Sequence, residues 1–247
     1  MILLTECATK RAVWYAAKYF FFLLLLICAA VLLYGVFQLI QPQPDPQAAY
    51  NPGRQKIIVD AGHGGGDGGA VSASGLLEKE LNLELSLVLR DMLCAAGYDV
   101  IMTRSDDSML TWEGAPSAKS GDLRARTEIA NANPDALFVS IHMNKFPSES
   151  VRGVQLYYSP NHLESRSIAS AIRDGVRAQL QPWNERPLKE AGSNIYVLDR
   201  IRSPAVLVEC GFLSNAGEAA MLSRAEYRQA LALVISSSLL DYLDKAG

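Results

Sequence analysis

Residues 56–77, which read KIIVDAGHGGGDGGAVSASGLL, decide the fold of this chain. The opening KIIVD is a short apolar run that ends at a glycine cluster, which is typical of a buried strand. Residues 61–77 then form a long loop, and residues 78–96 carry apolar side chains at helical spacing. Gly97 is expected to end that helix. A buried strand, a loop and an amphipathic helix in this order predict an α/β fold.

The rest of the chain continues to alternate between strand and helix patterns. Strands are predicted over 98–103, 136–141, 153–159, 193–198 and 204–209, and helices over 122–132, 162–180 and about 225–243. We therefore expect one domain at residues 55–247, with a mixed, largely parallel sheet covered by helices on both faces. Sheets of this kind place their ligands beyond the carboxyl ends of the strands, so the functional site is expected at that edge.

A long apolar segment precedes this domain. Residues 19–40 are almost entirely apolar and about as long as a helix that crosses a bilayer, roughly 20 residues. Residues 1–18 contain three basic side chains, which predicts a cytoplasmic N-terminus, a signal-anchor and an exported domain at the cell membrane. Residues 41–54 are rich in Pro and Gln and predict an extended linker. A cleaved signal segment and a buried core helix are the two alternatives.

Composition and charge exclude several classes of protein. With 247 residues, 49% hydrophobic and 20% charged, the chain is neither low-complexity nor collagen-like. A net charge of −3 argues against a nucleic-acid partner, whose binding depends on neutralising phosphates. Cys94 and Cys210 both lie in apolar runs of the domain, so we expect two buried thiols, with a disulfide as the alternative.

Two of the chain's three histidines follow predicted buried strands. His63 comes after KIIVD and His142 after ALFVSI, while Glu209 ends the run PAVLVE. Glu78 starts the first long helix, across the glycine loop from His63. A buried carboxylate is costly unless it is paired with a cation or a metal. Two His and one carboxylate form a catalytic zinc arrangement, in which a further carboxylate can serve as general base.

Each of these features also has a structural explanation when taken alone. A single His after a strand can be a hydrogen-bonded structural residue, and the glycine loop can be a phosphate cradle, although it lacks the Lys-Ser/Thr ending of a P-loop. Glu78 can be a carboxylate that the helix dipole favours, and Glu209 can belong to a buried ion pair. The joint arrangement of His, His and Glu at three strand ends favours a metal site.

Four motifs, in order along the chain, resemble those of the zinc-dependent N-acetylmuramoyl-L-alanine amidases of bacterial cell walls, the Amidase_3 type. They are IIVDAGHGG-x-DGGA, LLEKELNLELS, ALFVSIHMN and PAVLVECGFLSN, and YDVIMTRSDD and LRARTEIAN fit as well. The resemblance implies that His63, Glu78 and His142 bind one zinc ion and that Glu209 is the catalytic carboxylate. It also implies that peptidoglycan is the substrate, cleaved between the lactyl group of N-acetylmuramic acid and L-alanine.

The glycine loop, the apolar N-terminal segment and the lack of a wall-binding module are similar to the germination-specific subgroup of this family. That similarity implies a role in spore-cortex synthesis, where muramic-δ-lactam forms, with secretion toward the cortex if the segment is cleaved. Vegetative cell-wall turnover, a zinc exopeptidase on the same scaffold and a non-catalytic wall-binding protein are the alternatives. Asn144, Arg186 and Lys189 are candidate substrate contacts because they are polar and close in sequence to site elements; a solvated loop is the alternative for each.

Overall fold

The computed structural model describes residues 18–20, 22–32 and 54–246, and the chain divides into two units, Met1–Asp45 and Pro46–Gly247. In the first unit, the described residues are helical. Within the described part of the chain, no helix combines the length and the apolar character that crossing a membrane requires.

Parts of the predicted N-terminal organisation cannot be compared with the structure. Residues 1–17, Phe21 and residues 33–40 of the expected cytoplasmic segment and membrane span lie outside the described residues. The same holds for residues 41–53 of the expected linker. The signal-anchor therefore stays a prediction.

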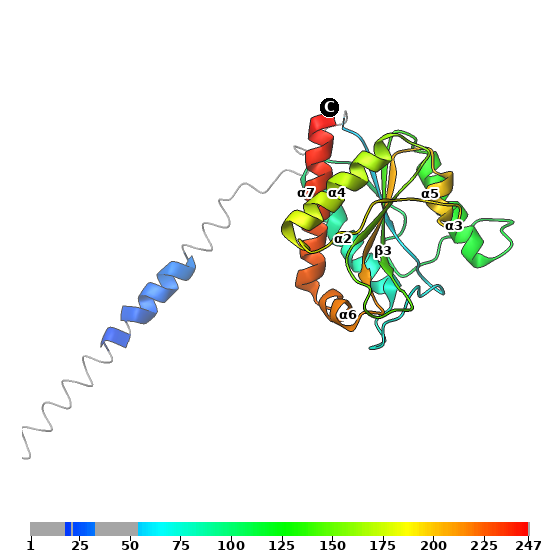
Figure 1. Cartoon of the computed structure of the whole chain (residues 1–247). Coiled ribbons are helices and arrows are strands. Elements are labelled where there is room, and N and C mark those ends of the chain that lie inside the picture. Colours follow the sequence, from blue (N-terminus) through cyan, green and yellow to red (C-terminus); the bar gives the residue numbers. More distant parts are fainter. Residues whose placement is uncertain (1–17, 21, 33–53, 247) are drawn as a thin grey trace, which may run out of the picture. The chain divides into compact units, whose positions relative to one another are not determined.

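The second unit contains a six-stranded sheet with the order β2-β1-β3-β6-β4-β5 (Figure 1). Its strands are β1 (Ile57–Ala61), β2 (Val100–Met102), β3 (Leu137–Asn144), β4 (Gln155–Tyr158), β5 (Lys189–Glu190) and β6 (Ala205–Phe212). Strands β2, β1, β3 and β6 run parallel, while β4 is antiparallel to β6 and parallel to β5. The predicted mixed, largely parallel sheet is confirmed.

Helices cover both faces of this sheet, as predicted. They are α2 (Glu78–Ala95), α3 (Ala118–Asn131), α4 (Glu164–Gln179), α5 (Tyr196–Arg200), α6 (Ala216–Leu222) and α7 (Ala225–Ala246). Helices α2, α4 and α7 lie on one side of the sheet, and α3 and α5 lie on the other (Figure 1). Because side chains alternate between the two faces of a strand, each face carries its own apolar core.

Helix α2 shows how the sequence pattern positions the site. Leu81, Leu85, Leu89 and Leu93 recur at helical spacing, and all four are buried against the sheet. Gly97 has φ +86° and its N–H bonds to the carbonyl of Cys94, so it ends the helix as predicted. The buried leucines fix the axis of α2, and this places its first residues at the carboxyl edge of β1.

The predicted strand over 193–198 is wrong, because residues 196–200 form helix α5. A turn from Gly192 to Ile195 is followed by the helical bonds Asp199 N–H to the Ile195 carbonyl and Ile201 N–H to the Val197 carbonyl. A short apolar run has the same pattern in a buried strand and in one helical turn, so periodicity does not separate them. Here the helical turn buries Val197 and Leu198 in the apolar core on the face of the sheet that α3 and α5 cover.

The prediction of two buried thiols is half correct. Cys210 lies in β6 and is fully buried, whereas Cys94 is exposed, and both are free. Cys94 follows the buried Leu93 directly in α2, and successive helix positions are turned by about 100°, so only one of the two faces the core. Within a helix, an apolar run in the sequence therefore does not mean that every residue of the run is buried.

Candidate metal centre

The carboxyl ends of three neighbouring strands bring the predicted site residues together. Strand β1 ends at Ala61, two residues before His63, and β3 pairs with β6 so that His142 lies opposite Glu209. Strands β3 and β6 continue to Asn144 and Phe212, beyond the predicted ends. The parallel register nevertheless places His142 and Glu209 side by side at the edge where the sequence predicts the site.

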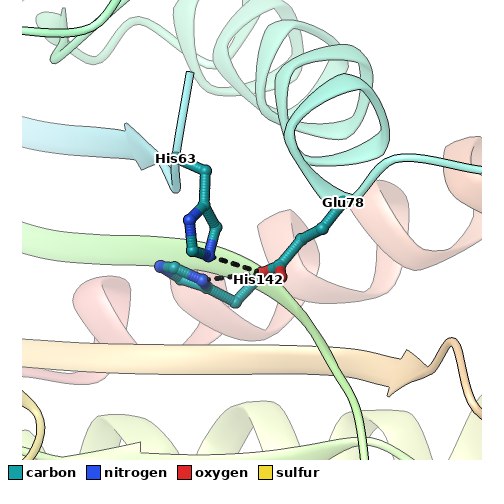
Figure 2. Close-up of side chains that lie close together, drawn as sticks. All are labelled: His63, Glu78 and His142. Carbon is teal, nitrogen blue, oxygen red and sulfur yellow. Dashed lines mark hydrogen bonds and ion pairs between the residues drawn. The ribbon is translucent and has the colours of Figure 1, made fainter. Parts of the chain in front are cut away.

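His63, Glu78 and His142 form a compact cluster at this edge (Figure 2). Each offers one ligand atom, and these atoms lie within 4.8 Å of one another. Glu78 Oε1 is 3.2 Å from His63 Nε2 and 2.9 Å from His142 Nδ1, and the two imidazole rings stand edge to face at 76°. Two imidazole nitrogens and one carboxylate oxygen are the donor set of catalytic zinc sites.

Glu78 is held as a buried carboxylate. Its Oε2 accepts a 2.7 Å hydrogen bond from the Ala70 N–H, and its Oε1 accepts one of 3.1 Å from the Met143 N–H. Burial raises the pKa of Glu78, but hydrogen bonds from His142 and His63 and their charges outweigh burial and hold the pKa well below its ordinary value. Glu78 is therefore ionised at neutral pH, as a metal ligand must be.

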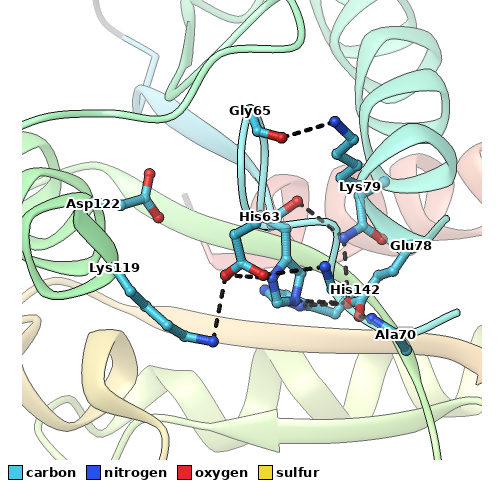
Figure 3. Close-up of polar contacts among 12 residues, drawn as sticks. His63, Gly65, Ala70, Glu78, Lys79, Lys119, Asp122 and His142 are labelled. Atoms are coloured by element: carbon cyan, nitrogen blue, oxygen red, sulfur yellow. Dashed lines mark hydrogen bonds and ion pairs between the residues drawn. The ribbon is translucent and has the colours of Figure 1, made fainter. Parts of the chain in front are cut away.

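A second carboxylate orients His63 (Figure 3). Asp67 Oδ2 lies 3.0 Å from His63 Nδ1 and 3.3 Å from Lys119 Nζ, and Asp67 Oδ1 accepts a hydrogen bond from the Gly69 N–H. Burial lowers the pKa of His63, but contacts with Glu78 and Asp67 outweigh it and raise the pKa. A hydrogen bond of this kind at one ring nitrogen fixes which nitrogen faces a metal. Here the nitrogen turned toward Glu78 is Nε2.

Glu209 differs from the other carboxylates of the site. Its Oε2 atom is buried and has no hydrogen-bond partner among the described residues. Burial raises the pKa of Glu209 to about 7. The positive charge of His142 lowers this pKa, and the negative charge of Glu78 raises it. A buried oxygen without a donor is costly unless something beyond the protein satisfies it. An ion that carries a water molecule fits both this oxygen and the adjacent donor set.

A cleft of about 220 Å³ opens beside the cluster. His63, His142 and Glu209 are among its lining residues, and α3 and α5 contribute Leu123 and Tyr196. The cleft therefore gives a substrate a mostly apolar approach to the Glu209 carboxyl group.

The candidate substrate contact Arg186 lies in the segment before β5 and contacts residues of β4 and β6. Its guanidinium stacks on the Phe212 ring at 4.6 Å, and its Nε donates to the Arg152 carbonyl. Its Nη1 is 3.4 Å from Oε1 of Gln155, the residue that pairs with Glu209 across β4 and β6. Arg186 is thus fixed next to the site edge.

The other two candidates are placed differently. Asn144 is the last residue of β3, two residues beyond His142, and its side-chain oxygen accepts a hydrogen bond from the Lys145 N–H. Lys189 is exposed in β5, with its ammonium 5.6 Å from the centre of the Tyr157 ring. Sequence reasoning missed Asp67, although its position within GHGGGDGG was a usable signal.

Comparisons with known proteins identify the family of this chain. Residues 57–241 match the family model described as N-acetylmuramoyl-L-alanine amidase. The chain is 37% identical over 194 residues to the germination-specific N-acetylmuramoyl-L-alanine amidase of Bacillus subtilis. The matched region covers 77% of this chain and 81% of that protein.

Solved structures of amidases are similar as well. The CwlD amidase of Clostridioides difficile, solved in complex with the GerS lipoprotein, matches with a TM-score of 0.73 and 34% identity over 77% of this chain and 99% of that one. The amidase AmiC2 of Nostoc punctiforme matches with a TM-score of 0.67 and 28% identity over 78% and 98%. The expected resemblance and enzyme class are confirmed: the chain belongs to the N-acetylmuramoyl-L-alanine amidase family.

Proposed function

We propose that this chain hydrolyses the amide between the lactyl group of N-acetylmuramic acid and the L-alanine of the peptidoglycan stem peptide, with zinc as its metal. The observation that carries the proposal is the cluster of His63, Glu78 and His142, in which Glu78 is buried, beside an oxygen of Glu209 that has no hydrogen-bond partner among the described residues. His63, Glu78 and His142 would hold the ion. When bound, zinc supplies a Lewis acid for the scissile carbonyl and lowers the pKa of a bound water.

In this proposal the protein's own residues move the protons. Glu209 Oε2 accepts a proton as the water oxygen attacks the carbonyl carbon, and then donates it to the alanine nitrogen as the C–N bond breaks. A carboxyl group whose pKa is raised to about 7 suits both steps near neutral pH. The products are a free lactyl carboxylate on the glycan and a peptide with an alanine amino terminus.

The neighbouring contacts support these roles. Asp67 holds His63 with its Nε2 turned to the ligand cluster, and two backbone N–H groups hold the Glu78 carboxylate. Arg186, which contacts Gln155 next to Glu209, is proposed to contact the substrate, as are Asn144 at the end of β3 and Lys189 in β5. Alanine variants of these three residues should raise KM more than they lower kcat.

Product analysis tests the reaction. Purified peptidoglycan treated with the full-length chain should release peptides that begin with L-alanine and leave glycans with free lactyl carboxyl groups, as read by mass spectrometry. Release of single amino acids from an end of the stem peptide would point instead to a zinc exopeptidase.

We further propose that the reaction serves spore-cortex synthesis, on the basis of the similarity to the germination-specific amidase. Deleting the gene should remove muramic-δ-lactam from the cortex and leave the vegetative wall unchanged. A cortex with normal muramic-δ-lactam and an altered vegetative wall would favour the turnover role.

The apolar segment at residues 19–40 is proposed to anchor the domain on the outer side of the cell membrane, on the basis of its sequence. A reporter fused after Gly247 should then be active outside the membrane and sediment with it. Mature protein that begins near residue 50 and stays in the soluble fraction would identify the segment as a cleaved signal.

A further inference from the structure

His63 has an unusual backbone conformation. Its φ is +60°, and it is the one non-glycine residue with a positive φ in the described part of the chain. This left-handed region is uncommon for residues with a side chain. Such a conformation persists where the surroundings determine it, and it is often found at functional sites. The question is which contacts determine it at His63.

Arg126, on α3, provides one set of contacts. Its Nη2 donates to the His63 carbonyl at 2.7 Å and its Nη1 to the Ala61 carbonyl at 2.8 Å. The remaining N–H groups bond to the carboxylates of Asp60 and Asp122. All five guanidinium donors are therefore used, and the residue is only 2% exposed. Arg126 is held rigidly and in turn holds the backbone of the loop.

Arg104, which follows β2, provides the second set of contacts. Its Nε donates to the Ala61 carbonyl at 2.8 Å, and its Nη2 donates to the Gly62 carbonyl at 2.9 Å. The same Nη2 donates to the carbonyl of Lys79, at 2.8 Å. Lys79 is the residue after Glu78 in the first turn of α2. One guanidinium thus joins the backbone of the His63 loop to the backbone beside Glu78.

These contacts fix both backbone angles of His63. A peptide unit is planar, so the direction of the Gly62 carbonyl sets the plane before His63 and that of the His63 carbonyl sets the plane after it. Arg104 donates to the first carbonyl, as does Asn82 Nδ2 at 3.1 Å, and Arg126 donates to the second. Restraining both planes restrains φ and ψ of His63, and with them the direction in which the imidazole leaves the backbone.

We propose that Arg104 and Arg126 are positioning residues that preset the metal centre, holding His63 and Glu78 in ligand geometry before the ion arrives. The proposal rests on the proposed function, in which these residues bind zinc. It gives a role to Arg104 of the motif YDVIMTRSDD and to Arg126 of the motif LRARTEIAN, whose described hydrogen bonds go to backbone carbonyls and to Asp60 and Asp122. Lysine cannot replace either arginine, because one ammonium nitrogen cannot span carbonyls that a planar guanidinium reaches from separate nitrogens.

Zinc affinity of the metal-free, full-length chain tests this proposal, measured by competition with a chromophoric chelator. Arg104→Lys and Arg126→Lys should each weaken zinc binding by about 10–100-fold, the range found when groups that orient metal ligands are removed. Arg228→Lys is the matched control, because Arg228 is also buried, donates to the Leu222 carbonyl and pairs with Glu84, all outside the centre. It should lower the melting temperature and leave zinc affinity unchanged.

The proposal is overturned if both lysine variants lower the melting temperature as Arg228→Lys does and still bind zinc with the affinity of the unmodified chain. If Arg126→Lys fails to fold because Asp60 and Asp122 lose their partner, Arg104→Lys decides, since its described partners are carbonyls. A crystal structure of metal-free Arg104→Lys is an independent readout. His63 should leave φ +60° there, and retention of that angle would contradict the proposal.

Failure of the proposed function gives a different pattern. In that case the unmodified chain binds no zinc, or His63→Ala binds it equally well. The conformation of His63 in the metal-free variant still decides whether the arginines position the loop.

Discussion

Replacing Glu209 by Gln separates the chemistry of this residue from its contribution to stability. The substitution keeps the size of the side chain and removes its charge. Because Glu209 Oε2 has no partner among the described residues, no hydrogen bond that the structure shows at this atom is lost. Turnover should nevertheless fall by about 10²–10⁴-fold, the usual contribution of a general acid–base group.

The same substitution should stabilise the metal-free protein. A rise in the Glu209 pKa from its ordinary 4.5 to about 7 means that the folded state disfavours the ionised form. At 1.36 kcal/mol per tenfold change, the penalty is about 3 kcal/mol at most, and Gln removes it. For a domain of this size that corresponds to roughly 6–12 °C in melting temperature.

The sign of the pH dependence follows from the same linkage. Between pH 4.5 and about 7 the unfolded chain releases the Glu209 proton while the folded chain retains it, so this group lowers stability as pH rises through that window. The melting temperatures of unmodified and Glu209→Gln protein should therefore diverge above about pH 5 and differ most above pH 7. The assay is thermal unfolding of metal-free protein across pH, with turnover on peptidoglycan measured in parallel.

Two results would refute this reasoning. A lower melting temperature for Glu209→Gln at pH 8 would mean that the carboxylate has a stabilising cationic partner. Near-normal turnover would mean that another group accepts the proton from water.

Three further predictions concern the ligands, the core and the cysteines. His142→Ala should abolish zinc binding by elemental analysis, whereas His162→Ala, whose side chain accepts a hydrogen bond at the start of α4, should retain it; equal zinc content would remove His142 as a ligand. Leu89→Ala should cost about 2–5 kcal/mol in chemical unfolding, because Leu89 is fully buried under the sheet; a loss below 1 kcal/mol would contradict that packing. Cys94 should react with a thiol reagent at pH 8 while Cys210, whose thiol pKa is raised by burial, stays unreacted in the folded protein; labelling of both would place Cys210 at the surface.

The clustering of the candidate metal ligands could be predicted from sequence because the rules behind it are local. Parallel buried strands end at one edge, so His63 and His142 had to be neighbours once their strands were recognised. The helical spacing of Leu81, Leu85 and Leu89 placed the start of α2 over the same edge.

Other features were set by contacts between distant segments. Helix α5 was mistaken for a strand because five residues do not distinguish the two periods. Arg104 and Arg126 donate hydrogen bonds to backbone carbonyls of the His63 loop that lie more than 40 positions away along the chain. Nothing in the local pattern of either motif indicates that its arginine faces inward.

The most direct test of the metal centre is a crystal structure of the zinc-loaded chain, with the ion located by anomalous scattering at the zinc edge. One zinc ion should lie about 2.0–2.2 Å from a nitrogen of His63, a nitrogen of His142 and an oxygen of Glu78, with a Glu209 oxygen hydrogen-bonded to its fourth ligand. Zinc at another position, or Glu209 as a direct ligand in place of Glu78, would contradict the account.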